Sequence, residues 1–103
     1  SIEVDSDGAQ LFASKGCTQC HSTQGPPKFD QMGPNLTLFG ARAMLAAGIL
    51  ENTDDNLKTW LSNPDDVKEG NLMYEEAPVY QNANMKLTDS EILILVNYLR
   101  NLK

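Results

Sequence analysis

Both cysteines and the only histidine of the chain stand together at Cys17-Thr18-Gln19-Cys20-His21. Two thiols two residues apart on a helical turn can reach the two vinyl groups on one side of a porphyrin and add across them as thioethers. The adjacent imidazole then points at the iron as the proximal ligand. The motif therefore predicts one covalently attached haem c, with Cys17 and Cys20 as attachment points and His21 as an iron ligand.

Three other uses of the cysteines were weighed against haem. A thioredoxin-like redox pair expects a βαβ context, and no strand pattern surrounds residue 17. A structural zinc site needs two further Cys or His ligands, which this chain lacks. A disulfide across two residues would stabilise the fold very little. Haem attachment is the interpretation that the composition favours.

The size and charge of the chain limit the remaining possibilities. With 103 residues it forms one domain at most, and we expect residues 6–103 to make up that domain after a linker or frayed end at 1–5. A net charge of −6 argues against nucleic-acid binding. No apolar run reaches the roughly 20 residues of a membrane span. The acidic, polar start shows no signal peptide, so we expect either a removed leader or a piece of a longer chain.

Helical spacing and capping residues predict an all-α fold of about four to five helices with long loops. A first helix is expected at residues 7–14, a short one at 42–47 stopped by Gly48, and another after the N-cap Thr53 that ends before Pro64. Residues 22–36 and 64–87 are expected to be irregular. The clearest helix follows Thr88, which forms a capping box with Glu91. Wrapping a haem is a task that explains such long loops.

With these features in place, the sequence resembles class I cytochromes c over nearly its whole length. The resemblance implies that the terminal helices cross at Gly8 and that the Pro34 carbonyl accepts the proximal histidine's free N–H. It also implies that Trp60 donates to a haem propionate and that Arg42 lies near a propionate. The matching pieces are Gly8…Phe12, Cys17–His21, Gly33-Pro34-Asn35-Leu36, Asn56-Leu57-Lys58-Thr59-Trp60-Leu61, Gly70-Asn71-Leu72-Met73 and Leu95…Tyr98-Leu99.

The central pieces resemble more narrowly the cytochrome c domain fused to subunit II of caa-type haem–copper oxidases. This resemblance implies a domain that accepts electrons from a small redox protein and passes them to the dinuclear copper site of the same subunit. It implies a place on the outer face of the bacterial cytoplasmic membrane, anchored through the parent subunit. The isolated domain would then be a monomeric electron carrier, not an enzyme.

The second axial ligand must come from a methionine, because the single histidine excludes bis-histidine ligation within the chain. Met32 lies too close to the proximal turn to cross the porphyrin, and Met44 is expected to pack in a short helix. Met73 and Met85 remain as candidates. The short tether from Met85 to Thr88 leaves it little freedom to swing across the haem.

The family resemblance favours Met73 as this ligand, with Met85 as the alternative. Two departures from the family pattern bear on the choice. Tyr74 follows Met73 where the family usually has proline, and residues 75–84 look like an insertion.

The whole net charge falls between residues 51 and 76, where eight acids face two lysines. This segment is either a solvated face or a surface that steers a basic partner. The alternatives to an oxidase domain are a free class I cytochrome c and a five-coordinate haem enzyme or gas binder. The acids are Glu51, Asp54, Asp55, Asp65, Asp66, Glu69, Glu75 and Glu76, and the lysines are Lys58 and Lys68.

Overall fold

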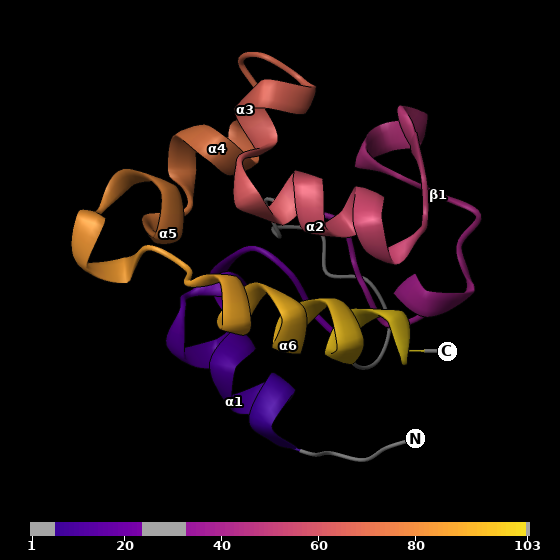
Figure 1. Cartoon of the computed structure of the whole chain (residues 1–103), viewed down its shortest axis with the longest axis horizontal. Helices are drawn as coiled ribbons and strands as arrows, with labels where there is room; N and C mark the ends of the chain where they lie inside the picture. Colours follow the sequence, from indigo (N-terminus) through magenta and orange to yellow (C-terminus); the bar gives the residue numbers. More distant parts are fainter. Residues whose placement is uncertain (1–5, 24–32, 103) are drawn as a thin grey trace.

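The computed structural model describes residues 6–23 and 33–102. Six α-helices and one antiparallel pair of very short strands occur within these ranges (Figure 1). The expected linker at 1–5, Lys28, Met32 and most of the expected loop at 22–36 lie outside the described residues. The elements are α1 (Ser6–Ser14), β1 (Met44–Leu45), β2 (Leu50–Glu51), α2 (Asp54–Ser62), α3 (Pro64–Val67), α4 (Leu72–Glu76), α5 (Pro78–Gln81) and α6 (Asp89–Arg100).

The first and last helices cross closely, as the sequence predicts (Figure 1). A Cβ placed on Gly8 would lie 2.4 Å from the Cβ of Tyr98, so only glycine permits this approach. One turn further on, the buried ring of Phe12 packs 5.8 Å from the ring of Tyr98. The crossing therefore fixes the end of α1, from which the segment with the cysteines and the histidine continues.

The caps of α2 and α6 are confirmed. The Thr53 side chain accepts a hydrogen bond from the Asn56 N–H, and α2 ends at Ser62, before Pro64. At the start of α6, Thr88 and Glu91 form the reciprocal capping box. Caps act within one turn of chain, so their residues are sufficient to predict them.

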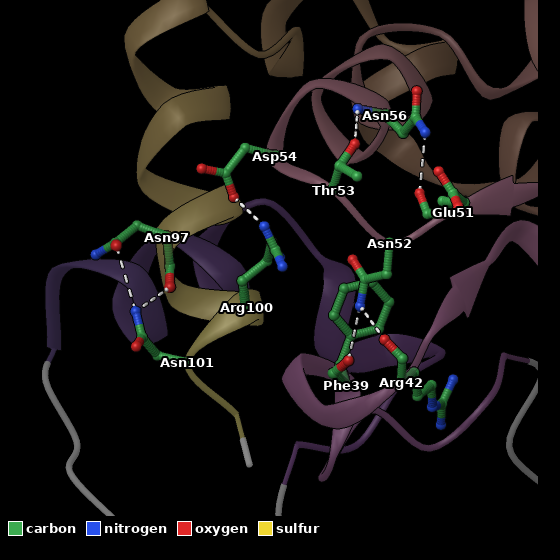
Figure 2. A network of polar contacts seen from close by, with 10 residues as sticks. All are labelled: Phe39, Arg42, Glu51, Asn52, Thr53, Asp54, Asn56, Asn97, Arg100 and Asn101. Carbon is green, nitrogen blue, oxygen red and sulfur yellow. Dashed lines mark hydrogen bonds and ion pairs between the residues drawn. The ribbon is translucent and has the colours of Figure 1, made fainter.

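The expected helix at residues 42–47 is wrong. In its place β1 pairs with β2, Met44 opposite Glu51 and Leu45 opposite Leu50. The buried side chain of Asn52 holds the backbone that leads into β1 by donating to the carbonyls of Phe39 and Arg42 (Figure 2). These tertiary hydrogen bonds outweigh the high intrinsic helix propensity of an alanine-rich stretch.

The expected irregular segment at residues 64–87 is also wrong, since α3, α4 and α5 lie within it. Pro64 and Pro78 each stand in the first turn of a short helix, where the missing N–H costs nothing. Asn63 and Asn71 cap the N-termini of α3 and α4 with their side-chain oxygens. Both prolines therefore start helices within a segment that the sequence predicts to be irregular.

The core lies where α6 packs against α1 on one side and α2 on the other (Figure 1), with the turn at Phe39–Ala41 also packed against α6. Leu57 of α2 and Leu95 of α6 are its most deeply buried side chains, each 1% exposed. The buried apolar residues are Phe12, Leu36, Phe39, Leu45, Leu57, Leu61, Val79, Leu87, Ile92, Leu95, Val96 and Leu99.

Candidate functional site

A cavity of about 370 Å³ lies beside this core, with walls drawn from most elements of the fold. Buried apolar side chains form much of its surface, including Leu57 and Leu61 of α2 and Leu95 and Leu99 of α6. The residues that the sequence analysis placed at the haem all line it. They are Cys17, Cys20, His21, Pro34, Arg42, Trp60 and Met73.

The attachment motif forms a single tight turn at the cavity wall. Gly16 adopts a left-handed backbone with φ 83°, which ends the path of α1 and starts the 3-10 turn at Cys17–Gln19. The N–H of His21 then donates to the carbonyl of Cys17 at 3.0 Å. Both sulfurs and the imidazole thus belong to one turn that faces one cavity.

The ring of His21 is held by the backbone of Pro34. Its Nδ1 lies 2.8 Å from the Pro34 carbonyl oxygen, which can only accept, so Nδ1 carries the proton. Burial lowers the pKa of His21, the hydrogen bond to Pro34 offsets part of this effect, and the nearby charge of Arg42 adds a smaller lowering, so the neutral form is favoured. A neutral imidazole protonated at Nδ1 presents a free lone pair at Nε2, which is the form that binds iron.

Gly33 makes room for this ring. A Cβ at position 33 would lie 2.5 Å from Cε1 of His21. The Gly33 N–H also donates to the carbonyl of Cys20 at 2.9 Å, which ties the Gly33-Pro34 segment to the attachment turn. The proximal side of the cavity is therefore built by two short segments that hold each other.

The thiol of Cys17 does not resemble a redox nucleophile. Burial raises the pKa of Cys17 to about 11, well above that of an ordinary thiol. Cysteines that exchange disulfides have pKa values lowered below about 8. In the part of the chain that the structure describes, no three His, Cys, Asp or Glu side chains gather as a metal site. Neither a thioredoxin-like pair nor a zinc site fits.

The two candidate methionines occupy different places. Met73 lies in the first turn of α4, which begins where the Asn71 side chain accepts the Tyr74 N–H, and it lines the cavity. Met85 packs against the core at residues 83–85 and is absent from the described cavity lining. Met44, expected in a helix, instead lies in β1, 40% exposed, with its side chain at the cavity.

Trp60 and Arg42 line the cavity from two different segments of the chain. Trp60 projects from α2 and is half-buried. The guanidinium of Arg42 donates to the Asn35 carbonyl and lies 5.9 Å from the centre of the Phe39 ring. Arg42 and Trp60 thus line a mostly apolar cavity whose walls also include the charged residues Lys15, Lys68 and Glu76.

This set of residues fits haem c. The apolar walls suit a flat hydrophobic macrocycle, and an imidazole and a thioether are the soft N and S donors that haem iron takes. A cation and a polar N–H suit its carboxylate groups. The fit to haem c is thus inferred from the chemistry of the residues that surround the cavity.

The family model for cytochrome c matches residues 6–103 of the chain. The chain belongs to the cytochrome c family. Its mostly helical structure is that of a class I cytochrome c, as the sequence analysis predicted. Membership of this family implies that the cavity binds haem c.

The comparison with curated proteins confirms the narrower resemblance to oxidase subunit II. The chain is 36% identical to cytochrome c oxidase subunit 2 of Bacillus subtilis (strain 168) over 98% of its length. It is 36% identical to the same subunit of Alkalihalophilus pseudofirmus over 93%, and 39% identical to that of Bacillus sp. (strain PS3) over 97%. The chain spans about a quarter of each relative, 25–27% of their length.

Several features of the site were missed from the sequence. The structure adds Gly33 as the space for the His21 ring, Met44 and Tyr80 as cavity residues, and Asn52 as a buried support. A spacing of four between Leu57 and Leu61 was the available signal for the α2 wall. Asn52 carries no such signal, because its partners become neighbours only after folding.

Among the described residues, no helix is both long and apolar enough to cross a membrane.

Proposed function

We propose that this domain carries single electrons through one haem c, attached by thioethers at Cys17 and Cys20 and ligated by His21 and Met73. The observation that carries the proposal is that one apolar cavity gathers both thiols, a ring-locked imidazole and the thioether of Met73. When bound, haem c supplies an iron that changes charge by one unit, which is the chemistry of one-electron transfer.

The residues of the chain would hold the haem and set its reduction potential. His21, whose ring is held by Pro34, would bind the haem iron through Nε2, and Met73 would bind it through its thioether sulfur. With both residues bound, the iron would have no site left open to a substrate. A methionine ligand would raise the reduction potential. The apolar lining would exclude water, and Arg42 and Trp60 would bind the propionates.

The parent protein, we infer, is a cytochrome c oxidase, and the domain is the cytochrome part of its subunit II. Relatives that carry this domain in about a quarter of their length support this. The domain would take electrons from a small redox protein and pass them to the copper site of the same subunit. It would face the outer side of the cytoplasmic membrane.

The axial assignment is tested by two matched variants, Met73→Ala and Met85→Ala, of the haem-loaded domain. Ferric haem with a thioether ligand shows a weak charge-transfer band in the far red. We expect Met73→Ala to lose this band and Met85→Ala to keep it. The reverse pattern would assign the ligand to Met85.

Binding of carbon monoxide separates a carrier from a haem enzyme. With both axial positions filled, the reduced domain should not take up carbon monoxide readily, whereas Met73→Ala should. Stoichiometric, unforced uptake by the unmodified domain would favour a five-coordinate enzyme or gas binder.

The size of the parent chain separates the oxidase domain from a free carrier. A haem-stained denaturing gel of cell fractions, identified with an antibody to this domain, should show a membrane band several times larger than 11.4 kDa. A band near 11.4 kDa that is not bound to membranes would instead indicate a diffusible cytochrome c.

A further inference from the structure

The side chain of Asn52 is buried, 8% exposed, and supports the backbone that carries Arg42. Its amide donates to the carbonyl of Phe39 at 3.0 Å and to the carbonyl of Arg42 at 3.1 Å (Figure 2). The backbone N–H of Asn52 donates to the Ala43 carbonyl at 2.8 Å. Three hydrogen bonds from one residue therefore hold both ends of a turn.

The same turn is held from its other side by the end of the chain. The N–H of Gly40 donates to the Leu102 carbonyl at 2.6 Å, and the Arg42 N–H closes the turn on Phe39 at 3.1 Å. The backbone at Arg42 is thus clamped between Asn52 and the segment after α6. Arg42 itself lines the cavity, and its guanidinium donates to the Asn35 carbonyl.

Other side chains of the same network do not reach this turn. Asn56 donates to the carbonyl of Glu51 at 3.0 Å and takes part in the N-cap of α2, and Arg100 pairs with Asp54 (Figure 2). Asn56 is therefore a matched control for Asn52: an asparagine amide on a backbone carbonyl, four residues away, without contact to Phe39 or Arg42.

We propose that Asn52 is a positioning residue for Arg42: it holds Arg42 where the guanidinium meets a haem propionate. The inference rests on the proposed function. Within the described part of the chain, Oδ1 of Asn52 is buried without a hydrogen-bond partner, and such an acceptor is destabilising. The Asn52 side chain therefore acts through the two hydrogen bonds that it donates, and both acceptors lie in the turn that carries Arg42.

The reduction potential reports this role. A cation beside the haem favours the reduced state, which carries one less positive charge, so removing Arg42 lowers the potential. If Asn52 acts through Arg42, Asn52→Ala lowers the potential in the same direction. In an Arg42→Ala background, loss of Asn52 should therefore cause no further change in the reduction potential.

The test is a double-mutant cycle on the haem-loaded domain, with midpoint potential as the readout. The variants are Asn52→Ala, Arg42→Ala, both together, and Asn56→Ala as control. We expect Asn52→Ala to lower the potential, the double variant to equal Arg42→Ala, and Asn56→Ala to match the unmodified domain. If Asn52→Ala does not fold, Asn52→Ser, which is too short to reach both carbonyls, enters the same cycle.

The outcomes that overturn the proposal are distinct from failure of the proposed function. An Asn52 effect that persists undiminished without Arg42, or a folded Asn52 variant with unchanged potential, overturns the positioning role alone. An unmodified domain that matures without covalent haem overturns the proposed function and this inference with it. Equal shifts in Asn52→Ala and Asn56→Ala would assign both to general loosening of the fold and so overturn the role of Asn52.

Discussion

The imidazole Nδ1 of His21 lies 2.8 Å from the carbonyl oxygen of Pro34, and this bond fixes which nitrogen faces the cavity. A hydrogen bond of this kind sets the tautomer, the orientation and the basicity of a ligating ring. Gly33 stands directly against the same ring. The proximal side of the site therefore depends on a residue with no side chain as much as on the histidine.

Gly33→Ala should destabilise the domain and disturb the iron. The added Cβ would meet the His21 ring at 2.5 Å, and such overpacking costs about 1–3 kcal/mol. Thermal unfolding gives the loss of stability, and the haem spectrum gives the change at the ligand. Gly70→Ala is the control for the spectrum, because its Cβ meets nothing within 4 Å: its φ of +77° should cost stability through backbone strain but leave the haem spectrum unchanged. A normal spectrum and full stability in Gly33→Ala would contradict the geometry.

Gly8→Ala should weaken the crossing of α1 and α6. Its Cβ would meet the Cβ of Tyr98 at 2.4 Å, an atom that no rotation of the tyrosine can remove. We expect a loss of about 1–3 kcal/mol in the free energy of unfolding by denaturant. The loss should persist in a Tyr98→Ala background, since alanine keeps that Cβ. Rescue by Tyr98→Ala would show that the ring, not the backbone approach, limits the space.

The capping box predicts a stability contribution that depends on pH. The hydrogen bond from the Thr88 N–H, with help from Lys15, lowers the pKa of Glu91 below its usual range. A carboxylate whose folded pKa is depressed stabilises the fold fully above its unfolded pKa, and this contribution is lost as pH falls through the folded value.

Glu91→Gln tests this, because glutamine keeps the capping oxygen without the charge. The unmodified domain should be more stable than Glu91→Gln near pH 7, and the difference should shrink below pH 4.5 in urea unfolding. Thr88→Ala, which removes the other half of the box, should cost about 1 kcal/mol. A difference between the unmodified domain and Glu91→Gln that grows as pH falls would contradict the assigned pKa direction.

The acidic segment at residues 51–76 predicts slower electron exchange at higher salt if the partner is basic. Glu76 is exposed and lines the cavity, so Glu76→Gln should slow association severalfold at low ionic strength, up to about tenfold. Asp7→Asn, in the first turn of α1, removes an equal charge outside the segment and serves as control. Stopped-flow rates across a salt series measure both. A flat salt response would leave these acids as a solvated face only.

The parts of the fold that could be predicted from sequence are those with local causes. The box at Thr88 and Glu91 and the cap at Thr53 act within one turn, and both stand in the structure. The segment at 42–47 failed because Asn52, ten residues from Arg42 in sequence, extends it by hydrogen bonds that exist only after folding. The helix after Thr53 ends before Pro64, as predicted, but the segment 64–87 is not irregular, because Pro64 and Pro78 also stand in the first turns of α3 and α5, a position that proline suits.

The candidate site divides in the same way. Cys17, Cys20 and His21 could be predicted because their chemistry requires adjacency in sequence. The choice between Met73 and Met85 depends on which side chain reaches the cavity, and that depends on helices of four and five residues whose existence the prolines obscured. The roles of Gly33 and Asn52 depend on neighbours brought close by folding, so no local pattern marks them.

The central claim is that this domain holds one haem covalently at Cys17 and Cys20. Intact-mass measurement under denaturing conditions, on protein matured in cells that attach c-type haem, tests it most directly. We expect one haem added to the 11.4 kDa polypeptide, retained after unfolding and lost in a Cys17→Ser/Cys20→Ser variant. A polypeptide of unmodified mass, or a haem released on unfolding, would contradict it.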